Sequence, residues 1–158
     1  MGEDPGAAVK ELLERVVAAL GLEATVEIAD DGETVTGTVH GEDLGLFIGR
    51  HGQTIDAVQH LAQRVSGARA EHGRRIVVDA EGYRDRREAI LRRQADRAAE
   101  DALRYARPVA LDAMTASERR IVHEYLREHG EVQTYSEGDE PERHLVVAPL
   151  GGVEGPGA

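Results

Sequence analysis

The sequence predicts an α+β protein with two small domains that are joined by a long helix. Hydrophobic periodicity in the first half of the chain gives the order helix, strand, strand, helix, strand. One helical pattern then runs over residues 83–107 and stops at Pro108, which cannot continue a helix. One more helix and several short strands follow. We expect domains at 1–82 and 83–150 and a disordered tail at 151–158, which is rich in Gly and Pro.

The first domain is expected to open with a helix over residues 7–20, where apolar side chains recur on one face. Residues 24–41 alternate between apolar and polar on either side of an Asp-Gly pair, which indicates a β-hairpin. A helical pattern from Ile55 to about Ser66 and a strand over 75–80 complete the domain. The apolar positions of its helices are Val9, Leu12, Leu13, Val16, Val17 and Leu20, then Ile55, Val58, Leu61, Ala62 and Val65.

The second domain is expected to begin with the long helix. Residues 108–114 favour a strand, and Thr115 and Glu118 form a capping box that predicts a new helix from about residue 116. A strand, a loop and a strand follow over 132–149. In the long helix the apolar seam is Leu91, Ala95, Ala98, Ala102 and Tyr105, and the supporting ion pairs are Glu88–Arg92 and Glu100–Arg104.

Composition limits the class of protein. Of the 158 residues, 41% are hydrophobic and 31% are charged, as in soluble globular proteins, and no apolar run approaches the roughly 20 residues of a membrane span. The chain has no cysteine, which excludes disulfides, thiolate nucleophiles and most structural zinc sites. We therefore expect a cytoplasmic protein without membrane insertion.

The net charge of −11 is unevenly distributed along the chain. Residues 1–45 carry a net charge of −9 and residues 129–158 carry −5, whereas residues 46–128 carry +3. A phosphate-binding surface is therefore compatible with the middle of the chain. With four Tyr, one Phe and no Trp, the composition does not favour recognition by aromatic stacking.

One short segment has a pattern that suits phosphate binding: Ile48-Gly49-Arg50-His51-Gly52-Gln53-Thr54-Ile55. The glycines allow a close approach of the backbone, and the start of the following helix offers N–H groups to an anion. Arg50 and His51 would project from the tip, and the two isoleucines could form an aliphatic floor for unstacked bases. The Walker A and dinucleotide patterns do not fit. The alternative is a helix N-terminal turn with incidental glycines.

On these residues, segment 7–80 resembles a type II KH domain. The resemblance implies the order αββααβ and a GXXG loop that clamps about four nucleotides of single-stranded RNA. It also implies that the RNA-binding residues are Ile48, Gly49, Arg50, His51, Gly52 and Ile55.

The helix after residue 115 has a cationic sector. Its cationic residues are Arg119, Arg120, His123 and Arg127, and its apolar residues are Ile121, Val122, Tyr125 and Leu126. At about 100° per residue, the cationic positions fall within one sector of about 100°, away from the apolar face. An ordinary polar face is the alternative.

His123 and His129 are six residues apart and cannot share a metal ion, and no G-x-S-x-G pattern occurs. We therefore expect no catalytic residue, metal or cofactor.

Arg119-x-x-x-His123 is the pattern of the R-three-H domain, which binds single-stranded nucleic acid, and residues 134–143 resemble that family's second signature. The resemblance covers about 84–149. It implies a nucleic-acid site formed by Arg119, Arg120, His123, Arg127 and Arg143.

A KH domain followed by an R-three-H domain is similar to the bacterial Jag, or SpoIIIJ-associated, proteins. Many of these carry an extra N-terminal domain and a linker, whereas this sequence starts directly at the KH domain, so we expect a form without that domain. The resemblance implies an RNA chaperone or post-transcriptional regulator, linked to cell elongation and division, with a small stand-alone KH protein as partner. Single-stranded DNA is an alternative ligand. The alternative function is a protein-interaction module with one or both nucleic-acid faces degenerate.

Overall fold

The computed structural model describes residues 4–67 and 73–151, and the chain divides into two compact units, 1–84 and 85–158. The boundary falls inside the long helix, whose first two residues belong to the first unit. Residues 152–158, which make up nearly all of the tail expected to be disordered, lie outside the described part of the chain.

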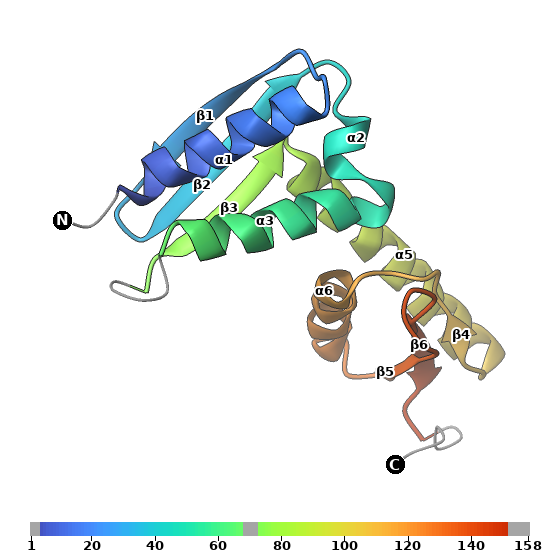
Figure 1. Ribbon diagram of the computed structural model, residues 1–158. Coiled ribbons are helices and arrows are strands. Elements are labelled where there is room, and N and C mark those ends of the chain that lie inside the picture. Colours follow the sequence, from blue (N-terminus) through green and yellow to red (C-terminus); the bar gives the residue numbers. More distant parts are fainter. Residues whose placement is uncertain (1–3, 68–72, 152–158) are drawn as a thin grey trace. The chain divides into compact units, whose positions relative to one another are not determined.

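The first unit is a three-stranded sheet with helices on one face (Figure 1). The strand order is β1-β2-β3, with β1 antiparallel and β3 parallel to β2. Its elements are α1 (Pro5–Ala19), β1 (Ala24–Asp30), β2 (Thr34–Gly41), α2 (Gly45–Ile48), the 3-10 helix η1 (Arg50–Gly52), α3 (Gln53–Val65) and β3 (Arg75–Ala80). This is the predicted αββααβ order.

One hydrophobic core lies between the sheet and the two long helices of this unit. Its fully buried side chains come from α1, from strands β2 and β3 and from the two helices that flank the glycine loop: Val9, Leu13, Val35, Val39, Phe47, Ile55, Ala62, Ile76, Val78 and Ala80. Leu61 and Val65 were expected in the apolar face of α3, but they are 48% and 49% exposed. The helix covers only the edge strand β3 and the flank of α1, so a narrower stripe than predicted is buried.

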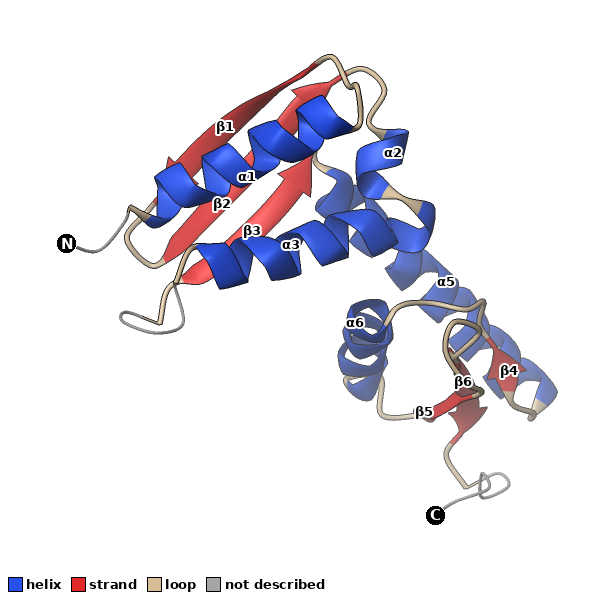
Figure 2. Cartoon of the chain, viewed as in Figure 1, coloured by secondary structure: helices blue, strands red, loops and turns tan. Residues whose placement is uncertain are grey.

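The second unit packs one helix and a small sheet against the rest of the long helix (Figure 2). Its elements are α5 (Tyr83–Tyr105), β4 (Val109–Ala110), α6 (Ala116–Arg127), β5 (Val132–Glu137) and β6 (His144–Pro149), with strand order β4-β6-β5 and both pairings antiparallel. The core contains Leu91, Ala95, Ala98, Ala99, Ala102, Met114, Val122, Leu126, Val132, Leu145 and Val147.

Two details of this unit differ from the sequence prediction. Tyr105 is 57% exposed rather than part of the seam, because α5 ends there, and Ala99 is buried instead. The strand expected over 108–114 shortens to β4, although the N–H groups of Leu111 and Met114 still donate to carbonyls of β6 and of the residue before it. The predicted ion pairs Glu88–Arg92 and Glu100–Arg104 are both present.

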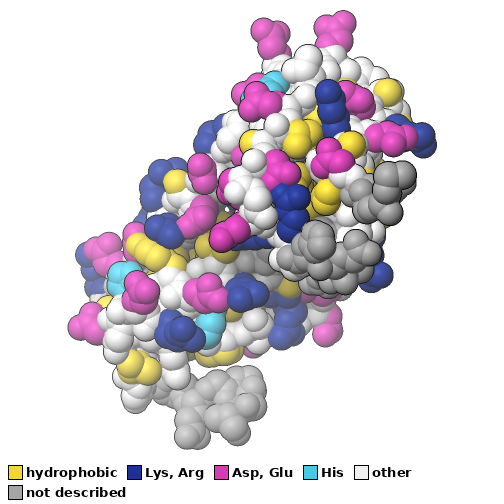
Figure 3. Space-filling model, turned by 90° about the vertical axis from the view of Figure 1, so that its left-hand side faces the viewer, with side chains coloured by type: hydrophobic (Ala, Val, Ile, Leu, Met, Phe, Trp, Pro, Cys, Tyr) yellow, Lys and Arg dark blue, Asp and Glu magenta, His cyan; other side chains and the backbone are white. Residues whose placement is uncertain are grey.

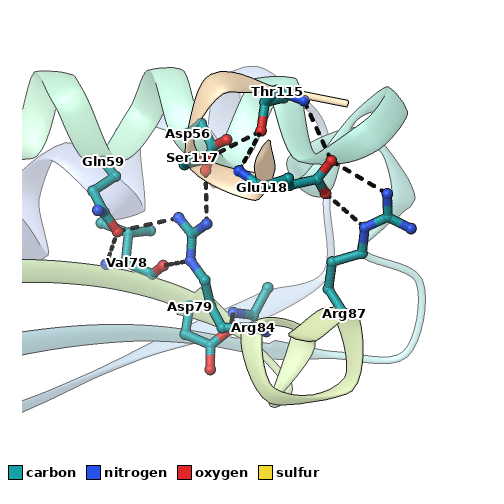
Figure 4. A network of polar contacts seen from close by, with 10 residues as sticks. Asp56, Gln59, Val78, Asp79, Arg84, Arg87, Thr115, Ser117 and Glu118 are labelled. Atoms are coloured by element: carbon teal, nitrogen blue, oxygen red, sulfur yellow. Dashed lines mark hydrogen bonds and ion pairs between the residues drawn. The ribbon is translucent and has the colours of Figure 1, made fainter. Parts of the chain in front are cut away.

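The capping box at the start of α6 is confirmed and extended. The Thr115 side chain accepts from the N–H of Glu118, and the Glu118 carboxylate accepts from the N–H of Thr115. That carboxylate is nearly buried and also forms two hydrogen bonds with the Arg87 guanidinium, the shorter at 2.6 Å (Figure 4). One buried acid thus caps α6 and fixes it to α5.

The core assignment of Ile55 predicts the effect of truncating it. Ile55→Ala is expected to lower the free energy of unfolding by about 2–5 kcal/mol, because the side chain is completely buried and a cavity would remain. Leu61→Ala, on the same helix but 48% exposed, is the control and should cost about 1 kcal/mol or less. Urea unfolding followed by circular dichroism measures both. Equal losses would contradict the assignment.

Candidate nucleic-acid interface

The glycine loop is a sharp connection between α2 and α3. Gly49 has φ 74° and ψ 173°, and η1 then makes a single turn. His51, at φ 55°, and Gly52, at φ 74° and ψ 17°, are both left-handed. Gly52 is the N-cap of α3, and within the described chain no side chain caps that end of the helix. Backbone groups rather than side chains therefore form the base of the loop.

The first glycine is required by both its conformation and its surroundings. The dihedral angles of Gly49 lie in a region that is essentially restricted to glycine. A Cβ at this position would lie 2.3 Å from Oγ1 and 2.8 Å from the backbone N of Thr54. The backbone of the loop thus packs directly on the first turn of α3.

The second glycine is enclosed by a residue that the sequence analysis did not single out. A Cβ at Gly52 would lie 2.7 Å from the hydroxyl oxygen of Tyr83, the first residue of α5. The Tyr83 side chain also packs against the core of the first unit. The beginning of α5 therefore supports the loop from the side of the core.

The next residue of α5, Arg84, forms a network with the first turns of α3 (Figure 4). Its guanidinium lies 2.6 Å from the Asp56 carboxylate, and it donates to the Gln59 side chain and to the Val78 carbonyl, each at 3.1 Å. Its backbone N–H donates to the Asp79 carboxylate, also at 3.1 Å. Arg84 therefore joins three elements behind the glycine loop: α3, the end of β3 and the start of α5.

The predicted residues of this loop separate into exposed and buried groups. Arg50 and His51 are exposed at the tip, Gly52 is buried and Ile48 is partly buried against the core. Ile55 is completely buried, so it is not accessible to a base. Of the two isoleucines expected to form an aliphatic floor, only Ile48 retains exposed surface. Ile48 lies at the end of the short helix α2, whereas Ile55 lies on the face of α3 that packs into the core.

In the second unit the predicted cationic sector is divided. Arg119 is 9% exposed, and its guanidinium donates to the Met114 carbonyl at 2.7 Å and pairs with Glu140 at 2.6 Å. This differs from the expected sector of surface cations, because the loop between β5 and β6 folds over the first turn of α6 and covers Arg119. Arg119 therefore holds that loop in place.

The other cations of the sector are accessible. Arg120, His123 and Arg127 are exposed, and Arg120 forms a surface ion pair with Glu124 at 3.0 Å. The His123 Nδ1 is hydrogen-bonded to the Thr134 hydroxyl, which orients the ring and leaves Nε2 as the nitrogen for an external group.

The two parts of the R-three-H signature, Arg119-x-x-x-His123 and residues 134–143, contact each other in the folded chain. His123 meets Thr134, and Arg119 meets Glu140, with one partner of each pair on α6 and the other in or after β5. The fifth predicted residue, Arg143, is partly buried and donates to the Gly138 carbonyl at 2.7 Å within the loop after β5.

Charges of both signs are mixed on the surface shown in Figure 3, so the position of a cation matters more than the net charge. Among the described residues, no group of three or more His, Asp or Glu side chains has the arrangement of a metal site. Within the same residues, no helix combines the length and the apolarity that a bilayer crossing requires.

The fold of both units agrees with comparisons to known protein families. Residues 7–80 match the family model for the KH domain of KhpA and KhpB, and residues 89–149 match the model for the R-three-H domain. The chain therefore combines a KH domain with an R-three-H domain that follows it. It belongs to the KhpB, or Jag, family.

Three relatives are each named RNA-binding protein KhpB. The chain is 31% identical over 147 residues to that of Bacillus subtilis, and this match covers 92% of the chain and 71% of the relative. Identity to the Clostridium symbiosum protein is 34% over 140 residues, which covers 87% of the chain and 63% of the relative. Identity to the Lactiplantibacillus plantarum protein is 36% over 141 residues, which covers 89% of the chain and 44% of the relative. The chain thus spans less than two thirds of the length of two of these relatives.

The geometry of Gly49 predicts a specific sensitivity to a methyl group. Gly49→Ala is expected to lower the free energy of unfolding by about 1–3 kcal/mol more than Gly67→Ala does. Both glycines have positive φ, but the Cβ at Gly49 would meet the backbone, whereas no described atom lies within 4 Å of one at Gly67. Thermal and urea unfolding of the two variants provide the comparison. Equal destabilisation would mean that the loop does not pack on Thr54 as described.

Proposed function

We propose that this protein is a non-enzymatic, single-stranded RNA-binding protein whose main site is the glycine loop of the first unit. The observation that supports this most strongly is the placement of Arg50 and His51. Both are exposed at the tip of a loop whose glycine backbone is fixed from behind by Tyr83 and Arg84. The relatives that carry the name RNA-binding protein support the same ligand class.

The proposed binding mode uses the backbone as much as the side chains. Glycine at positions 49 and 52 lets the loop backbone pack closely on Thr54 and Tyr83, and this holds the sharp turn whose exposed tip would meet a phosphate. The positive end of the α3 dipole favours an anion at the same place. Arg50 adds a permanent positive charge and His51 a hydrogen-bonding ring, while the partly exposed Ile48 offers an apolar contact to a base.

In the second unit we propose that Arg120, His123 and Arg127 contact nucleic acid, and that Arg119 positions the loop between β5 and β6. Arg143 belongs to that loop and contributes to the same surface. Single-stranded DNA is the alternative ligand for this site, because contacts to phosphate do not distinguish the two.

The wider role follows the family resemblance. We propose a cytoplasmic RNA chaperone or post-transcriptional regulator, linked to cell elongation and division, that acts with a small stand-alone KH protein. The alternative function is a protein-interaction module. It is favoured by the burial of Arg119 and by the acidic segments that flank the basic middle of the chain.

The loop assignment is tested by reversing its charge. Arg50→Asp with His51→Asp is expected to weaken binding of labelled single-stranded RNA and to flatten its salt dependence, because new anions would repel phosphates. Lys10→Asp with Arg15→Asp, on the exposed side of α1, gives a comparable change in charge away from the loop and should have a smaller effect. Fluorescence anisotropy at several salt concentrations measures both. Unchanged affinity in the loop variant, with unchanged melting, would contradict the proposed site.

The second unit should contribute through effective concentration when one RNA strand engages both sites. A long oligonucleotide is then expected to bind more tightly than a short one. Arg120→Ala with His123→Ala should reduce this advantage and leave binding of the short oligonucleotide unchanged. Arg119→Gln should instead lower the melting temperature, since Glu140 and the Met114 carbonyl lose their partner. If the Arg120/His123 variant keeps the full length advantage, the second unit is not an RNA site.

A further inference from the structure

The outer face of α5 carries a line of arginines that neither proposed site includes. These are Arg86, Arg93, Arg97 and Arg104, and all four are exposed. They are separated by seven, four and seven residues. At about 100° per residue, this spacing places all four within about 20° of a single line along the helix. We call this set the α5 stripe.

The stripe lies opposite the buried side of the helix. The buried residues Leu91, Ala95, Ala98 and Ala102 lie about 120–180° around the helix from Arg86, on the side that packs into the core of the second unit. The stripe therefore faces away from that core along several turns of the helix. Along the axis it is about 27 Å long, and the step from Arg93 to Arg97 is about 6 Å.

Pairing within the helix does not neutralise the two central arginines of the stripe, Arg93 and Arg97. Arg104 forms an exposed ion pair with Glu100 at 2.8 Å, and such a pair contributes little. Among the residues that the structure describes, neither Arg93 nor Arg97 forms an ion pair, whereas the neighbouring Arg92 pairs with Glu88 on another face. A surface that served only solubility would carry mixed charges along its centre. The two central positions of the stripe are instead cations available to an external anion.

We propose that the α5 stripe binds the phosphate backbone of single-stranded RNA, and this inference rests on the proposed function of the protein. Guanidinium groups form paired, charge-assisted hydrogen bonds with phosphate oxygens, and contacts to phosphate do not read base identity. A rigid helix presents them at regular intervals, which suits a ligand whose charges also repeat at regular intervals. The stripe gives the RNA a third, sequence-independent contact surface, carried by α5 itself.

The test replaces the two central arginines. Arg93→Gln with Arg97→Gln is compared with Lys10→Gln with Arg15→Gln, which removes the same charge from the exposed surface of α1. Affinity for a long single-stranded RNA is measured from low to moderate salt. The slope of log K against log salt is expected to fall by about 1.4 in magnitude for the α5 variant, about 0.7 for each lost phosphate contact, and to change less in the control. Arg93→Lys with Arg97→Lys should restore most of the slope.

Two results would overturn the inference. If both glutamine variants lose the same slope, general electrostatics rather than the stripe governs binding. If the α5 variant keeps the wild-type slope and instead loses binding to polyglutamate, the stripe serves an acidic protein. In both cases wild-type binding to RNA would leave the glycine-loop proposal standing. If the wild-type protein does not bind RNA at all, both proposals fail.

Discussion

The geometry of the glycine loop depends on the interaction between Arg84 and Asp56. This pair connects the first turn of α5 to the first turn of α3, and the same guanidinium reaches Gln59 and the Val78 carbonyl. Both side chains of the pair are 30% exposed, so solvent weakens its net contribution to stability. Its larger effect is on position and charge. It fixes α3, the helix that follows the loop, and it neutralises a carboxylate beside the place where a phosphate would bind.

The second unit uses ionic contacts in a comparable way, each with one partner that is buried. Glu118 caps α6 and pairs with Arg87 on α5, while Arg119 pairs with Glu140 on the loop after β5. A buried charge without its partner is costly, so each contact strongly favours one arrangement of helix and loop. Glu118 and Arg119 thus hold α6 in the position from which the exposed Arg120 and His123 face solvent. On α6 the supporting residues Glu118 and Arg119 are therefore followed directly by cations that face solvent.

Much of the fold could be predicted from periodicity and from local signals. The helices, the hairpin, the capping box at Thr115 and the GXXG segment all depend on residues close in sequence, and those patterns were sufficient. The exposure of Leu61 could not be predicted in this way, because it depends on how much of α3 the sheet covers.

The supporting roles of Arg84, Arg119 and Tyr83 could not be predicted from the sequence either. Arg84 is one of many arginines in a helical run, and its partners Asp56 and Gln59 lie 28 and 25 residues away in the chain. The burial of Arg119 has the same origin. Its angle on the helix places it beside other cations, and only the folded loop that carries Glu140 shows that it is covered. Tyr83 has no motif of its own, and it is recognised by its contact with Gly52.

The central claim is that residues 49–54 form a phosphate site that exists before RNA binds. The most direct measurement is a titration of the full chain with a short single-stranded RNA, followed by amide and arginine side-chain resonances in NMR spectra. We expect saturable shifts that are largest at the amides of Arg50 to Thr54, with the Arg84 Nε–H resonance present both before and after binding. Shifts centred on another surface, or an Arg84 signal that emerges only with RNA, would contradict the central claim.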